Sequence, residues 1–107
     1  MAFKSVQKKL TDTMTNIYTT PTGSSSIIFS GFICNIDTAE AEVKVDVQLT
    51  INSVTTNLLK AVPIPYGGYV VLPKVVVPAG GILKAAATTA TFSNKIDMTL
   101  SILEQTA

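Results

Sequence analysis

Serine and threonine hydroxyls are the most numerous groups in this sequence that could act as nucleophiles. The chain contains 15 threonines and 8 serines but no histidine. A hydrolase built from it would need a lysine or a carboxylate as the general base that activates the hydroxyl. The Gly-x-Ser-x-Gly sequence that presents a serine nucleophile at a sharp turn is absent. We therefore expect no catalytic residues and no enzymatic activity.

Four acidic residues gather on or beside one predicted strand: Asp37, Glu40, Glu42 and Asp46. Carboxylates that crowd one edge in this way could bind calcium or form a general acid/base pair. The Asp-x-Asp-x-Asp-Gly spacing of a calcium loop is absent, however, and Lys44 lies among the four. We interpret the cluster as the solvated face of a strand and expect no metal site.

Glycine and cysteine indicate no cofactor either. The pairs Gly67-Gly68 and Gly80-Gly81 match neither of the common phosphate-binding sequences and are typical of turns. Cys34 is the only cysteine, so the chain has no internal disulfide and no thiolate metal cage. Its apolar neighbours predict a small buried side chain.

Two tyrosines in a proline-rich loop are candidates for contact with a partner. Tyr66 and Tyr69 flank a glycine pair and could form a stacking platform for a sugar or a protein, or pack back on the rim of the fold. The lysines near the N-terminus could meet an acidic neighbouring subunit or belong to a solvated arm. The candidate partner-contact residues are Phe3, Lys8, Lys9, Pro65, Tyr66, Tyr69 and Pro73.

The low charge of the chain excludes further classes of function. Charged residues are 14% of the sequence, all eight basic residues are lysines, and the net charge is +1. Such a chain is a poor binder of nucleic acid, whose affinity rests on cation–phosphate contacts. The most apolar stretch, residues 61–78, holds four prolines, two glycines and a lysine, which argues against a membrane-spanning helix. We expect no nucleic-acid and no membrane partner.

The elements that must position these residues are strands. Val, Ile and Thr together make up 36 of the 107 residues, and such side chains favour a pleated sheet. Alternation and turn residues predict eight strands, at Phe3–Leu10, Thr13–Thr19, Ser25–Asn35, Glu42–Ile51, Thr55–Val62, Tyr69–Val77, Ile82–Thr89 and Lys95–Leu103. We expect an all-β fold, an antiparallel β-sandwich of seven to eight strands that is either jelly-roll-like or immunoglobulin-like.

The strand pattern also predicts which segments are central. Ser25–Asn35 is continuously apolar, which indicates a central strand buried on both faces. Pro73 makes Tyr69–Val77 an edge or bulged strand. The phenylalanines Phe3, Phe29, Phe32 and Phe92 are interpreted as anchors of the core or the arm. We expect residues 1–12 to form an N-terminal arm or edge strand and residues 13–107 a single sandwich domain.

Three stretches of the chain carry a family resemblance: ICNIDTAEAEVKVDVQL, NLLKAVPIPYGGYVVLPKVVVPAGGILKAAAT and KIDMTLSILEQ. With them the chain resembles small virion structural proteins of tailed bacteriophages, over about residues 16–105. One departure is Gly81-Ile82, where those proteins usually have an acidic residue after the glycine. The matching positions are Asn35, Asp37, Ile64, Pro65, Gly67, Ala79, Gly80, Asp97, Ser101 and Glu104.

The resemblance implies a structural protein located in the virion, with copies of itself and other virion proteins as partners. Its first expected role is a capsid cement or decoration subunit that stabilises the particle through subunit contacts. An alternative within the virion is a structural protein of the neck, tail or fibre attachment. Independently of the resemblance, Tyr66 and Tyr69 leave open a carbohydrate-binding, adhesin-type module. A small, charge-poor sandwich is consistent with such roles, because a partner would cover surface that it hydrates poorly.

Overall fold

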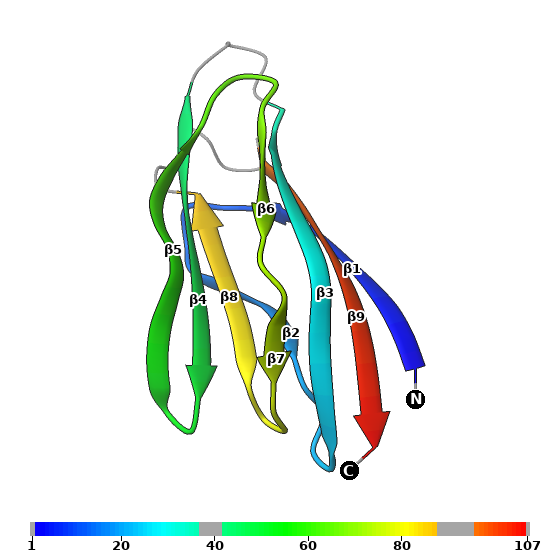
Figure 1. Cartoon of the computed structure of the whole chain (residues 1–107). Coiled ribbons are helices and arrows are strands. Elements are labelled where there is room, and N and C mark those ends of the chain that lie inside the picture. Colours follow the sequence, from blue (N-terminus) through cyan, green and yellow to red (C-terminus); the bar gives the residue numbers. More distant parts are fainter. Residues whose placement is uncertain (1, 37–41, 88–95, 107) are drawn as a thin grey trace.

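The strands of this protein form two layers that face each other (Figure 1). The computed structural model describes residues 2–36, 42–87 and 96–106. Within these ranges the prediction of an all-β antiparallel sandwich is confirmed, and no helix could cross a membrane. The strands are β1 (Ala2–Leu10), β2 (Thr15–Thr19), β3 (Ser24–Asn35), β4 (Val43–Ile51), β5 (Val54–Ile64), β6 (Tyr69–Leu72), β7 (Val75–Val77), β8 (Ile82–Ala87) and β9 (Ile96–Thr106).

The strands divide between a five-stranded and a four-stranded sheet. The first has the order β1-β9-β3-β6, with β7 also paired to β3, and the second has the order β2-β8-β4-β5. The described residues hold nine strands because Pro73 divides the expected Tyr69–Val77 strand into β6 and β7. Both pieces stay beside β3, so they share one strand position in the sheet.

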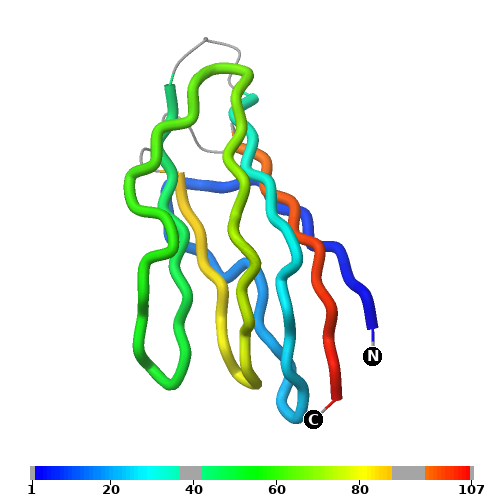
Figure 2. Tube along the Cα trace, viewed as in Figure 1, coloured from blue at the N-terminus to red at the C-terminus, as the bar shows by residue number. Residues whose placement is uncertain are grey.

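The N-terminal strand β1 forms an edge of the five-stranded sheet. All of its residues pair with β9 without a register shift, from Ala2 opposite Glu104 to Leu10 opposite Ile96. This pairing brings the two ends of the described chain to the same end of the sandwich (Figure 2). The division between residues 1–12 and a domain that starts at residue 13 stays a prediction.

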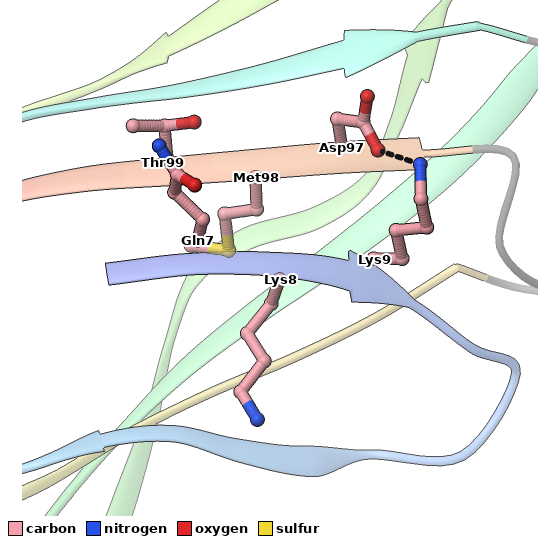
Figure 3. Close-up of a pocket in the computed structure, with 6 residues that line it drawn as sticks. All are labelled: Gln7, Lys8, Lys9, Asp97, Met98 and Thr99. Carbon is pink, nitrogen blue, oxygen red and sulfur yellow. Dashed lines mark hydrogen bonds and ion pairs between the residues drawn. The ribbon is translucent and has the colours of Figure 1, made fainter. Parts of the chain in front are cut away.

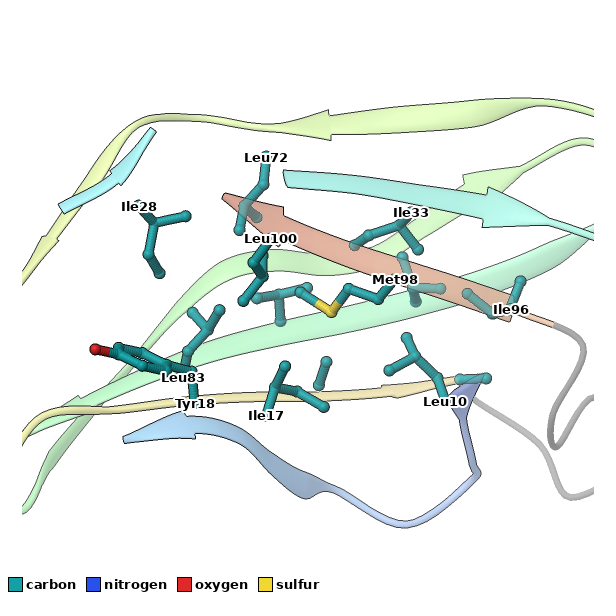
Figure 4. Close-up of a cluster of buried hydrophobic side chains, with 14 of the residues drawn as sticks. Leu10, Ile17, Tyr18, Ile28, Ile33, Leu72, Leu83, Ile96, Met98 and Leu100 are labelled. Atoms are coloured by element: carbon teal, nitrogen blue, oxygen red, sulfur yellow. The ribbon is translucent and has the colours of Figure 1, made fainter. Parts of the chain in front are cut away.

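The core lies between the sheets and consists mainly of aliphatic side chains (Figure 4). β4 shows the expected alternation, since Val43, Val45 and Val47 are fully buried whereas Lys44 is exposed. Alternate residues of a strand point to opposite faces, so each sheet turns one face toward the core. β9 contributes Ile96, Met98, Leu100 and Ile102 in the same way.

The prediction that β3 is buried on both faces is wrong. The strand is central, between β9 and the β6/β7 position, but Phe29 and Phe32 are 42% and 48% exposed. Cys34, also expected to be buried, is half-buried. The side of β3 that points away from the core is therefore open to solvent, and its apolar residues are not core anchors.

A β-bulge in β3 explains why the sequence pattern predicted burial on both faces of this strand. The register against β9 shifts between Ile28 and Ser30, which inserts one extra residue. The buried positions are even-numbered before the shift, at Ser26 and Ile28, and odd-numbered after it, at Gly31 and Ile33. Because the bulge interrupts the alternation of buried and exposed positions, the sequence of β3 shows one continuous apolar run although one face is buried and the other is exposed.

The edge strand β5 shows how the four-stranded sheet tolerates irregular residues. It continues through Pro63 to Ile64 instead of ending at Val62, because an edge strand accepts a residue that lacks an N–H. Register shifts against β4 accompany a positive φ of 50° at Ala61. The Asp46 carboxylate accepts a hydrogen bond of 2.6 Å from the Ala61 N–H, which gives Asp46 a structural role.

Candidate interaction surface

The five-stranded sheet carries large apolar side chains on its outer face, the side turned away from the core. We define six of these residues as the apolar patch. Their exposed fractions are 76% for Phe3, 42% for Phe29, 48% for Phe32, 66% for Tyr69, 50% for Val71 and 62% for Val76. Side chains of this size are usually buried, so their collection on one face requires an explanation.

The strand register brings the patch together from distant parts of the sequence. Phe3 lies opposite Leu103, which lies opposite Ile27, which in turn lies opposite Val76. Directly opposite residues in a sheet share a face, so this row crosses four strands. Farther along, Phe32 lies opposite Val71.

The aromatic rings of the patch form two pairs. Phe3 and Phe29 are stacked, with ring centroids 6.2 Å apart and an interplanar angle of 25°. Phe32 and Tyr69 are tilted at 55°, with centroids 6.1 Å apart. Both separations are within the range of attractive ring contacts. Within each pair, the ring contact therefore stabilises the positions of the two side chains on the solvent-exposed face of the sheet.

The apolar patch is comparable in area to the largest apolar patches found on monomers. With about 200 Å² of surface for each aromatic side chain, the four rings at these exposed fractions leave about 450 Å² in water. The two valines add to this area. The largest apolar patch on a typical monomer covers about 300–600 Å² and is often functional. The patch therefore lies in the upper part of that range, which marks the outer face as an interaction surface.

Polar side chains from β1 and β9 lie at one end of the five-stranded sheet (Figure 3). Lys9 Nζ and Asp97 Oδ1 form an ion pair at 2.8 Å. Together with Gln7 and Thr99, which lie opposite each other, they line a shallow depression of ≈ 390 Å³. Because the charges of Lys9 and Asp97 neutralise each other, this end adds no net charge to the outer face.

The outer face of the four-stranded sheet is polar by comparison. Lys44 is exposed, and Asp46, Gln48 and Thr50 alternate with the buried valines of β4. Lys84 of β8 lies opposite Gln48. The two outer faces therefore differ in chemistry, since both carry polar groups but the exposed aromatic rings Phe3, Phe29, Phe32 and Tyr69 lie on the five-stranded sheet. This contrast favours the five-stranded sheet as the side that a partner covers.

The predicted partner-contact residues occupy several places. Phe3 and Tyr69 belong to the apolar patch, and Lys9 lies beside it in the ion pair with Asp97. Lys8 projects from the opposite side of β1 (Figure 3). The remaining three are exposed outside the sheet rows, with Pro65 and Tyr66 in the turn between β5 and β6 and Pro73 between β6 and β7.

Sequence reasoning missed Phe29, Phe32, Val71 and Val76. The available signal was the long apolar run of residues 27–34, which requires apolar side chains on both sides of one strand. That run was interpreted as double burial. Tyr66 and Tyr69, expected as one possible stacking platform, do not form a ring pair in the structure; Tyr69 contacts Phe32 instead.

A buried polar network ties the two sheets together at one end of the sandwich. Tyr18 of β2 donates a hydrogen bond to Glu104 Oε2 on β9. Ser26 of β3, whose Oγ lies 2.6 Å from the Tyr18 hydroxyl, must then donate to that oxygen, because the single phenolic proton is used. Lys4 of β1 completes the network with an ion pair of 3.0 Å between its Nζ and Glu104 Oε1.

The network shifts the pKa values of both its acidic groups. The hydrogen bond from Tyr18, followed by that from Lys4, holds the pKa of Glu104 below its usual value of 4.5. Burial, followed by the hydrogen bond to Glu104, raises the pKa of Tyr18 above 10.0. Both shifts favour one protonation state, an ionised Glu104 beside a neutral Tyr18.

We expect these shifts to define a pH window of stability. The contribution of Glu104 is fully present above its usual pKa of 4.5 and is lost as the pH falls through the lower folded value. The contribution of Tyr18 is present below 10.0 and is lost as the pH rises through its higher folded value. Urea unfolding from pH 2 to 11 measures both limbs. An unfolding midpoint that does not change between pH 5 and pH 2 would contradict the assignment to Glu104.

The structure describes two of the four residues of the acidic cluster, Glu42 and Asp46. Asp46 is engaged with the Ala61 N–H, while Asp37 and Glu40 lie outside the described residues. Phe92, expected as an anchor, also lies outside them. In residues 2–36, 42–87 and 96–106, no three His, Cys, Asp or Glu side chains are grouped so that they could hold a metal ion.

Comparison with known proteins relates the fold to a viral protein. No family model and no curated protein matches the sequence. Among solved structures, a pentameric capsid protein isolated from metagenomic phage sequences matches with a TM-score of 0.50 and 17% identity, over 92% of this chain. A second structure of such a protein, solved by iodide SAD phasing, matches with a TM-score of 0.49 and 17% identity, over 92% of this chain and 63% of its own length. This chain spans 59% of the length of the first match. The sandwich described above is thus a fold that also occurs in a phage capsid protein.

Proposed function

We propose that this protein is a non-enzymatic structural subunit of a bacteriophage virion. The observation that carries the proposal is the apolar patch, since about 450 Å² of exposed aromatic surface on one sheet is expected of a subunit that is covered after assembly. The fold shared with a phage capsid protein supports the same setting. Because fold alone does not specify function, the exposed aromatic surface carries more weight than the shared fold.

We further infer that the sandwich is a jelly roll. If β6 and β7 count as one strand position, each sheet has four strand positions. Along the chain, every connection between consecutive positions then crosses from one sheet to the other, except the β4–β5 hairpin. Jelly rolls are eight-stranded double sheets that are common in viral capsid and lectin domains. This strand order favours the jelly roll over the immunoglobulin arrangement, in which consecutive strands often pair within one sheet.

Within the virion we propose a capsid position, as a cement or decoration subunit. The capsid is favoured because the structural match is described as a capsid protein that forms pentamers, and a self-associating subunit suits a shell built from many copies. The alternative is a structural position in the neck, tail or fibre attachment, where repeated copies also occur.

Immunogold labelling of intact phage particles tests this proposal. An antibody raised against the purified chain should label the particle, and capsid labelling in a regular pattern is the expected result. Label confined to the neck or tail would favour the alternative position. Particles that carry no label, and whose protein content by mass spectrometry lacks the chain, would overturn the virion role altogether.

A further inference from the structure

We propose that the apolar patch is covered by the same patch of a second copy of this chain, in a two-fold, face-to-face contact between the five-stranded sheets. This inference rests on the proposed function, which states that the patch is covered after assembly but not which molecule covers it. The area, the charge and the shape of the patch favour a second copy.

The area of the patch is suited to a dimer contact. Stable interfaces bury about 800 Å² on each partner, and their centres are apolar and rich in aromatic residues. The four rings expose about 450 Å² at about 200 Å² for each aromatic side chain. The valines of the patch and the polar side chains around it enlarge the contact toward the full size, with rings at its centre.

The charge on the outer face favours a copy of the same chain over a charged partner. In a two-fold contact each surface meets an identical surface, so a face with net charge would repel itself. The rows between the rings carry uncharged residues such as Ser5 and Ser101, which lie opposite each other. Lys9 is neutralised by Asp97 at 2.8 Å, and Lys74, exposed in the link between β6 and β7, is the charge that the contact has to leave in solvent. The other outer face carries Lys44 and Lys84 and would oppose such a contact.

The shape of the patch permits a second sheet to stack on it. Phe3 lies on the edge strand β1, Tyr69 lies on β6, and Phe29 and Phe32 lie on β3 between them. The rings therefore cross the whole sheet instead of gathering on one loop. Two sheets that stack face to face interdigitate such side chains across about 10 Å, as the two sheets within this subunit already do.

The test is the oligomeric mass of the purified full chain and of a charged variant. We expect light scattering at micromolar concentration to give twice the chain mass, and Val76→Lys to raise the dimer dissociation constant at least tenfold. Val76 is 62% exposed, so the substitution should leave the melting temperature unchanged when both proteins are measured below the dissociation constant of the dimer. The matched control is Asn57→Lys, at an exposed position of β5 on the other sheet, which should leave the dimer intact.

Subunit exchange identifies the partner as a second copy. Tagged and untagged wild-type chains should form a mixed dimer when they are combined, whereas tagged Val76→Lys should capture much less untagged chain at the same concentration. Cys34 supplies an independent readout, since it lies opposite Tyr69 on the same sheet. Its alkylation by iodoacetamide should slow at least several-fold as the protein concentration passes through the dissociation constant.

Failure of this inference can be distinguished from failure of the proposed function. A wild-type chain that stays monomeric at 100 μM, yet labels phage particles, would overturn the two-fold contact and point to another virion protein on the patch. A dimer that Asn57→Lys weakens as much as Val76→Lys would also overturn it. A dimer with the expected pattern that is absent from particles would overturn the virion role alone.

Discussion

Replacing Gly31 with valine is expected to lower the free energy of unfolding by about 1–3 kcal/mol, the usual cost of extra methyl groups in a packed core. Gly31 lies on the buried side of β3, opposite Leu72 and Leu100 on the neighbouring strands. A Cβ at this position would lie 2.8 Å from Leu100 Cδ2 and 3.0 Å from Leu72 Cβ. The Leu100 side chain could rotate, but Leu72 Cβ is attached to the backbone of β6 and can move only with that strand.

Urea unfolding monitored by circular dichroism measures this effect. The matched control is Ser30→Val, which adds a similar β-branched side chain one residue away on the half-buried outer side of the same strand and should change the free energy by less than about 0.5 kcal/mol. Gly31→Ala should fall between Gly31→Val and the wild type. Equal unfolding midpoints for Gly31→Val and the wild type would show that β3 and its neighbours are packed more loosely than described.

Replacing Tyr18 with phenylalanine is expected to cost about 1–3 kcal/mol, because it leaves buried polar groups without their hydrogen-bond partner. The change keeps the ring in the core but removes the hydroxyl that donates to Glu104 and lies 2.6 Å from Ser26 Oγ. Tyr18 comes from the four-stranded sheet, whereas Glu104 and Ser26 come from the five-stranded sheet. Its loss therefore removes a direct polar link between the two layers.

The pH dependence of stability separates this role from packing alone. Without the hydroxyl, the pKa of Glu104 should rise toward its usual value, because the hydrogen bond from Tyr18 is the main cause that lowers it. The part of the acid-induced loss of stability that Glu104 causes should then be smaller than in the wild type, because a smaller pKa shift contributes less pH-dependent stability, and the alkaline limb that Tyr18 causes should disappear. Tyr66→Phe, at a position that is 53% exposed, is the control and should alter neither stability nor its pH profile. A Tyr18→Phe variant with the wild-type acid limb would contradict the network.

The local sequence pattern was sufficient to predict those strands in which apolar and polar residues alternate without interruption. β4 could be predicted because valines alternate with polar residues over its length, and one face of a half-buried strand must be apolar. The break at Pro73 could be predicted because proline cannot continue the hydrogen-bond ladder. These are properties of residues near one another in the chain, so they can be read without knowing the fold.

Long-range pairing decided the features that matter most for the proposed function. The bulge at Phe29 depends on the register between β3 and β9, and the Tyr18–Glu104 hydrogen bond joins residues 86 positions apart. The apolar patch combines β1, β3, β6 and β7, none of which is unusual alone. A sequence pattern shows that a residue is apolar, but not which of its two possible faces will be covered.

By itself, the sequence determined that this protein is an all-β sandwich with no histidine chemistry, because residue types and their period of two suffice for both conclusions. Only the tertiary structure decided that Phe3, Phe29, Phe32 and Tyr69 lie together on one open sheet instead of in the core. The physical reason is the pairing of strands. Which side of a strand becomes the inside of a protein depends on the second sheet that packs against it, and that sheet is supplied by distant parts of the chain.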